Sequence, residues 1–121
     1  KIMLLQHAYV GKDEAAVELA AKRLSRFYCY FGSWFRNERP VTQAQIKALS
    51  DEEMAAMEMY SPENMRKNLL IGTSKQVIDR LKHYEDLGYD EFSFWIDSGM
   101  NSDDKRDSLA RFIDEVMPAF N

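Results

Sequence analysis

The sequence predicts an α/β fold with parallel strands, and three observations support this. Two short segments, residues 2–10 and 91–97, carry apolar side chains on both faces, as strands buried in a parallel sheet do. Segments with apolar side chains at helical spacing lie between and after them. Glycine (5) and proline (3) are scarce among the 121 residues, which argues against a β-sandwich with its many Gly/Pro-rich turns.

The first strand, "IMLLQHAYV" over residues 2–10, is too short for a helix and ends at Gly11. Asp13 offers an N-cap for a helix over residues 13–32. That helix carries one apolar stripe at helical spacing, formed by Val17, Ala20, Ala21, Leu24, Phe27, Tyr28 and Phe31.

The middle of the chain predicts a helical insertion over residues 40–68, without a strand. Pro40 disfavours a helical residue before it, and two capping boxes follow, Thr42 with Gln45 and Ser50 with Glu53. A methionine-rich patch follows in this segment, made of Met54, Met57, Met59 and Met65. We expect this insertion to be the most mobile part of the chain.

The last third repeats the order of helix, strand and helix. The short apolar run "NLLIGTS" leads into a helix over residues 74–87, which Gly88 closes. In the strand over residues 91–97, alternation puts Phe92, Phe94 and Ile96 on one face and Ser93, Trp95 and Asp97 on the other. A helix over residues 103–117 follows, capped by Ser102 or Asp103 and ended by Pro118.

Two strands that alternate with helices are expected to be parallel and joined by a right-handed crossover. Two strands do not make a stable sheet, so the chain needs a second copy of itself or further strands. It begins abruptly, with Lys1 directly before an apolar run, and we interpret that start as a cut within a longer protein.

Charge and composition exclude several classes of partner. The net charge is -4 without a basic run, which argues against nucleic-acid binding, and no apolar run reaches the roughly 18 residues of a membrane span. Cys29 has no second cysteine to pair with, and His7 and His83 are isolated, so we predict no metal site and assign neither histidine a role. We predict a reducing, cytoplasmic location.

Three segments together resemble the C-terminal portion of bacterial-luciferase-like, flavin-dependent monooxygenases: "LLQHAYVGKDEAAVELAAKRL", "GTSKQVIDRLKHYEDLGYDEFSFW" and "SLARFIDEVMPAF". The resemblance implies a (β/α)8 TIM barrel of about 250 residues or more, of which this chain is the C-terminal part. Residues 2–10 are then the seventh strand and 91–97 the eighth, and the insertion corresponds to the family's mobile segment over the active-site mouth.

In such barrels the active site lies at the carboxyl ends of the strands, where Trp95, Asp97 and Ser98 are expected. The resemblance adds Tyr28 as an aromatic contact to the flavin, and the helix start at Gly72 and Thr73 is a candidate phosphate site. Core packing of the aromatics and plain turn or helix capping remain the alternatives. The predicted substrate pocket comprises Tyr30, Trp34, Met54 and Met57, and no catalytic residue is identified.

The resemblance implies that the parent protein is an enzyme that uses reduced FMN and O2 to oxygenate a small organic substrate. A flavin reductase is a candidate partner, and we expect this chain alone to be inactive. Two alternatives stay open. One is hydride transfer with the deazaflavin F420 on the same fold, and the other is a non-catalytic module that self-associates into a homo-oligomer through its strand edges.

Overall fold

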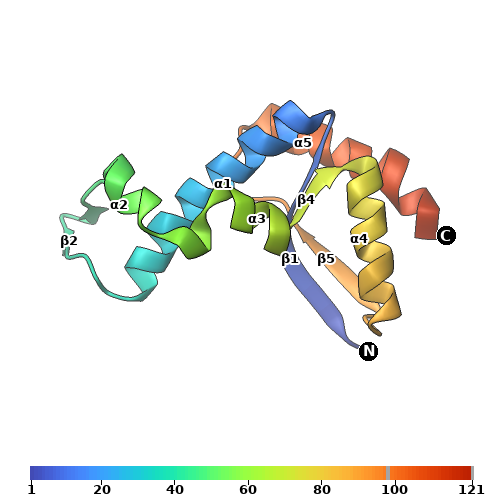
Figure 1. Cartoon of the computed structure of the whole chain (residues 1–121), viewed down its shortest axis with the longest axis horizontal. Coiled ribbons are helices and arrows are strands. Elements are labelled where there is room, and N and C mark those ends of the chain that lie inside the picture. Colours follow the sequence, from blue (N-terminus) through green and yellow to red (C-terminus); the bar gives the residue numbers. More distant parts are fainter. Residues whose placement is uncertain (98, 121) are drawn as a thin grey trace.

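The computed structural model describes residues 1–97 and 99–120. Its centre is a parallel sheet of three strands in the order β4-β1-β5 (Figure 1). Strand β1 (Met3–Gly11) pairs through its carboxyl half with β4 (Leu70–Thr73) and through its amino half with β5 (Glu91–Trp95). The carboxyl edge is therefore stepped, because β5 ends level with the middle of β1.

The prediction of two strands was wrong, because β4 is a third. This segment was interpreted as an apolar lead-in to the next helix. Leu70 and Ile71 are buried on opposite faces of the sheet, so the strand shows no apolar and polar alternation. A four-residue apolar run cannot be assigned to strand or helix from periodicity alone.

Helices cover both faces of the sheet, and alternate residues of β1 point to different layers. Tyr9 packs with α1 (Glu14–Phe35) and α3 (Pro62–Asn68), whereas Ala8 and Val10 pack with α4 (Ser74–Asp86) and the C-terminal helical turns. The first core contains Tyr9, Val17, Ala20, Leu24, Met65, Ile71 and Met100. The second contains Ala8, Val10, Leu70, Val77, Leu81 and Val116, with Phe92 and Phe94 against it as their alternation predicted.

The parallel α/β architecture is confirmed. In a (β/α)8 barrel successive strands are neighbours and the helices form one outer ring. The parallel pairing of β1 with β5 is consistent with part of such a barrel, and β4 covers the other edge of β1. Closure into a barrel stays a prediction.

Helix α1 follows its predicted stripe. The Asp13 side chain accepts a hydrogen bond from the Ala16 amide (2.8 Å), which is the predicted N-cap. The first four residues of the stripe, Val17, Ala20, Ala21 and Leu24, are fully buried. The helix extends to Phe35 rather than to residue 32 because Gly32 takes helical geometry.

Of the two capping boxes predicted in the insertion, the first (Thr42 with Gln45) is wrong and the second (Ser50 with Glu53) is confirmed. Thr42 and Gln45 belong to an antiparallel hairpin of β2 (Val41–Thr42) and β3 (Gln45–Ile46), and both residues between them have positive φ, as a type I′ turn requires. Ser50 and Glu53 do form a capping box at the start of α2 (Asp51–Ala55). A 3₁₀ turn (Glu58–Tyr60) links α2 to α3.

The C-terminal third follows the predicted order with shifted bounds. Gly88 has a φ of 94°, so it ends α4 as the predicted left-handed residue. Helix α5 (Ser102–Arg111) is capped by Asn101 and not by Ser102 or Asp103: the Asn101 side chain accepts from the Asp104 amide (2.8 Å). A π-helical segment (Phe112–Val116) and a 3₁₀ turn (Met117–Phe120) follow.

Candidate functional site

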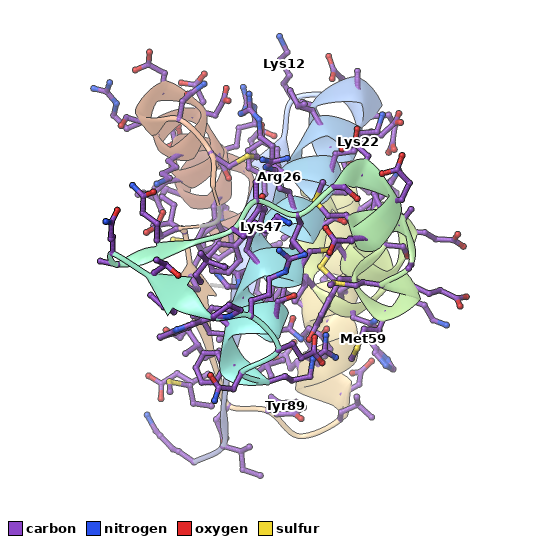
Figure 2. All side chains as sticks on the ribbon, turned by 90° about the vertical axis from the view of Figure 1, so that its left-hand side faces the viewer. Lys12, Lys22, Arg26, Lys47, Met59 and Tyr89 are labelled. Atoms are coloured by element: carbon purple, nitrogen blue, oxygen red, sulfur yellow. The ribbon has the colours of Figure 1, made fainter. Side chains whose placement is uncertain are left out.

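The carboxyl ends of the parallel strands form one edge, where ligands of α/β sheets bind. Two hollows lie there, and Lys12 and Arg111 line both of them. Lys12 projects from that end of the molecule in Figure 2, after the last residue of β1.

The first hollow, of about 390 Å³, lies between α1 and α5. Across it, Arg23 pairs with Asp104 at 2.8 Å, with both side chains about one-third exposed. Tyr9 is buried at its base, and that burial raises the pKa of the Tyr9 phenol, so its hydroxyl stays protonated at neutral pH. The phenol is therefore available to donate a hydrogen bond.

The second hollow, of about 440 Å³, lies at the start of α4 and includes Thr73. The Thr73 amide donates to the Gln76 side chain (2.9 Å), so part of this helix start is used by the capping box. Gly72 is required for that box, since a Cβ at residue 72 would lie 2.8 Å from the Cβ of Gln76. Lys12, Lys75 and Arg111 also line this hollow, together with one acidic residue, Glu115, so positive residues outnumber negative ones.

An aromatic cluster surrounds His7 in the middle of β1. The His7 Nδ1 lies 2.6 Å from the Tyr28 hydroxyl, and the imidazole stacks on Trp95 with ring centres 3.9 Å apart and an interplanar angle of 19°. Phe27 approaches it edge-on at 5.4 Å. The side chain is 1% exposed, and its Nε2 has no hydrogen-bond partner among the described residues.

Burial lowers the pKa of His7, although the backbone and carboxylate of Asp97 act in the opposite direction. Burial also raises the pKa of Tyr28. The pair is therefore neutral at neutral pH, and which group donates depends on the histidine tautomer. A neutral imidazole with an unpaired nitrogen can either donate or accept one further hydrogen bond.

Acidification is expected to destabilise the protein through His7. The folded-state pKa lies below the ordinary value of 6.5, so the unfolded chain takes up the proton first as the pH falls below about 6.5. Stability is thus full above that pH and is lost toward the folded-state pKa. Urea unfolding at pH 7 and pH 5 should show this loss, and His7→Phe should reduce it, whereas the exposed His83→Gln should not. An equal pH dependence in His7→Phe would assign the effect to other groups.

The predicted cofactor residues are partly brought together. Tyr28 and Trp95 meet at His7, and Trp95 keeps 40% of its surface exposed. Asp97 instead pairs with Lys105 (2.6 Å), which lowers the pKa of that carboxyl. Ser98 lies outside the described residues. Sequence reasoning missed His7, although a histidine within an otherwise apolar strand was the available signal.

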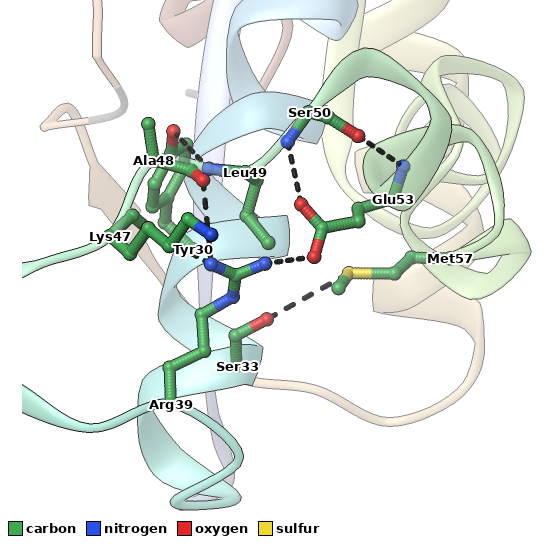
Figure 3. A network of polar contacts seen from close by, with 9 residues as sticks. All are labelled: Tyr30, Ser33, Arg39, Lys47, Ala48, Leu49, Ser50, Glu53 and Met57. Atoms are coloured by element: carbon green, nitrogen blue, oxygen red, sulfur yellow. Dashed lines mark hydrogen bonds and ion pairs between the residues drawn. The ribbon is translucent and has the colours of Figure 1, made fainter.

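The predicted substrate pocket is not assembled as one cavity. Met57 lines a hollow of about 560 Å³ together with Ser33 and Arg39, and its sulfur lies 4.0 Å from the Ser33 hydroxyl (Figure 3). The Tyr30 hydroxyl instead accepts from the Leu49 amide (2.9 Å). Trp34 is 52% exposed at the end of α1, and the Met54 carbonyl faces the Cys29 sulfur at 4.0 Å.

Arg39 joins the hairpin of the insertion to α2 (Figure 3). Its guanidinium donates to the Lys47 carbonyl (3.1 Å) and to the Glu53 carboxylate, which also accepts from the Ser50 amide (2.7 Å). With the Tyr30 contact, this network holds the insertion against α1. The insertion therefore docks on α1 at a defined position. Its mobility stays a prediction.

Within residues 1–97 and 99–120, no helix is both long and apolar enough to cross a membrane. The same ranges contain no group of three or more His, Cys, Asp or Glu side chains placed to hold a metal ion.

Comparison with known proteins identifies the family. A family model described as luciferase-like monooxygenase matches residues 1–91. The whole chain is 56% identical to a protein of Acinetobacter baylyi described as "Flavin-dependent trigonelline monooxygenase, oxygenase component", and it spans 34% of the length of that relative. The resemblance read from the three sequence segments is thereby confirmed, and the chain belongs to the luciferase-like monooxygenase family.

Proposed function

We propose that this chain is part of the oxygenase component of a flavin-dependent monooxygenase. The observation that supports it is the 56% identity over all 121 residues to a relative described by that activity. We propose FMN in its reduced form as the cofactor, and O2 and a small organic molecule as the substrates. The description "oxygenase component" also supports a separate flavin reductase as the partner, whereas nothing in it favours F420.

The residues at the carboxyl edge fit a flavin in two respects. Among residues 1–97 and 99–120 the buried His7 Nε2 has no hydrogen-bond partner, and it lies beside the partly exposed ring of Trp95, which suits a flat heteroaromatic ring that carries hydrogen-bonding groups. Lys12, Lys75 and the start of α4 offer positive charge for a phosphate. When bound, reduced FMN activates O2 so that one oxygen atom is transferred to the substrate.

In this proposal the chain orients the cofactor and shields it from water. Trp95 and Tyr28 contact the ring, Tyr28 fixes the orientation of His7, and Thr73 and Gly72 lie beside the phosphate. Met57 and the insertion border the substrate, together with Tyr30, Trp34 and Met54. We propose that the substrate is a small nitrogen heteroaromatic compound related to trigonelline, because the relative's description names that molecule.

The test is anaerobic titration of the full-length protein with reduced FMN, followed by addition of O2 and trigonelline. We expect tight binding of reduced FMN and a product heavier by one oxygen atom. Trp95→Ala should weaken the binding, and Phe35→Ala, an exposed aromatic on the same helix as Tyr28, should not. Binding of neither redox form of FMN, or hydride transfer from F420 without O2 uptake, would overturn the proposal.

Self-association and location remain proposals beside this one. In the described sheet β4 and β5 pair on one side only, so we propose that their outer edges are covered by further strands or by a second copy. Light scattering of the purified full-length protein should show a homo-oligomer if a second copy covers them. We also propose a cytoplasmic location, which cell fractionation tests.

A further inference from the structure

A separate hollow of about 290 Å³ lies at the amino-terminal ends of β1 and β5. It is at the opposite end of the molecule from the carboxyl edge, as the positions of Tyr89 and Lys12 in Figure 2 show. Its lining comes from α4, the following turn, the two strands and the C-terminal helical turns. It therefore does not belong to the site proposed for the flavin.

Aromatic rings form the walls of this hollow. Tyr84 and Tyr89 stand nearly perpendicular, with ring centres 6.0 Å apart and planes at 71°. The positive φ of Gly88 turns the chain back, so that the Tyr89 amide donates to the Tyr84 carbonyl (3.1 Å) and the two rings face one space. Phe92, Phe112 and Phe120 complete the aromatic lining.

The charge around these rings has one sign. Three acidic residues, Glu85, Asp90 and Glu91, are among those that line the hollow, and within the described ranges no lysine, arginine or histidine lines it. Asp90 accepts a hydrogen bond from the Ile2 amide (2.7 Å), which fixes the orientation of its carboxylate.

We propose that this hollow binds a small organic cation of the quaternary-ammonium type. Aromatic faces attract such cations through their quadrupoles, and nearby carboxylates add charge attraction without requiring a hydrogen-bond donor on the ligand. The volume is close to the lower end for small-molecule sites, which favours a free small molecule over a segment of a partner protein. The proposal does not depend on flavin chemistry.

Choline is the probe, and saturation-transfer NMR with the full-length protein is the measurement, supported by calorimetry. The N-methyl signals of choline should receive saturation from the protein. The matched neutral molecule 3,3-dimethylbutan-1-ol has nearly the same shape without the charge. We expect its affinity to be lower than that of choline by a factor of about five or more. Equal binding of the two would show that only apolar contact matters and would overturn the proposal.

Variants separate the aromatic and charge contributions. Tyr89→Phe retains the ring and should keep choline affinity, whereas Tyr89→Leu should weaken it about five- to tenfold. Glu85→Gln should also weaken it, and Glu63→Gln, an exposed residue of α3, should not. Unchanged affinity in Tyr89→Leu overturns the proposal. Tighter binding of N-acetylarginine amide than of choline also overturns it, in favour of a partner's side chain. Circular dichroism checks that each variant is folded.

Discussion

Replacing Leu24 by alanine is expected to lower the free energy of unfolding by about 3 kcal/mol. Leu24 is 0% exposed, and it belongs to the first core together with Tyr9 of β1 and Ile71 of β4. The loss combines two contributions: the hydrophobic transfer free energy of the removed side-chain atoms, and the cost of the cavity that remains. Urea unfolding of the purified protein measures the difference.

Leu19→Ala is the matched control for this change. It lies on the same helix and loses the same atoms, but its side chain is 48% exposed, so its cost should stay below about 1 kcal/mol. Equal losses in the two variants would mean that α1 does not pack on the sheet through its Leu24 face. That result would contradict the described layer of helices on this side.

Replacing Gly32 by alanine is expected to destabilise the protein only while Tyr60 is present. A Cβ at residue 32 would lie 2.6 Å from the Tyr60 ring, so the ring would have to leave its stacked position 5.9 Å from Tyr28. Such overpacking costs about 1–3 kcal/mol, which exceeds the gain of about 1 kcal/mol that alanine brings to a helix interior. We expect a net loss of about 1 kcal/mol.

The sign should reverse in a Tyr60→Ser background, where the space is free. There Gly32→Ala should stabilise the protein by up to about 1 kcal/mol, through helix propensity alone. The four proteins of this double-mutant cycle, compared by urea unfolding, give the coupling between the two positions. A loss of the same size in both backgrounds would show that the crowding at residue 32 comes from another group.

Local signals in the sequence predicted much of the fold. Asp13, Gly88 and the Ser50 and Glu53 pair each act within a few residues, and each has its predicted role. Thr42 and Gln45 have the same spacing as a capping box, but Gln43 and Ala44 adopt positive φ and close a hairpin. Nothing in the spacing of two residues distinguishes these outcomes, because both satisfy local hydrogen bonds.

The candidate site was less predictable because it depends on contacts between distant segments. Tyr28 follows Leu24 by four residues and continues its stripe, which places it over the sheet. That it meets His7 depends on how α1 packs on β1, and that Trp95 stacks on the same imidazole depends on the register between β1 and β5. Tyr30 and Met54 were grouped by residue type, whereas their surroundings are set by how the hairpin docks on α1.

The central position of β1 has a consequence for how the chain is made. During synthesis β1 leaves the ribosome before β5, and β5 begins 80 residues after the last residue of β1. Throughout that interval one edge of an apolar strand has no partner from this chain. Loop closure over such a separation is slow, and an open strand edge promotes aggregation meanwhile. We therefore expect chaperones or neighbouring strands to cover β1 during synthesis, before its own C-terminal partner arrives.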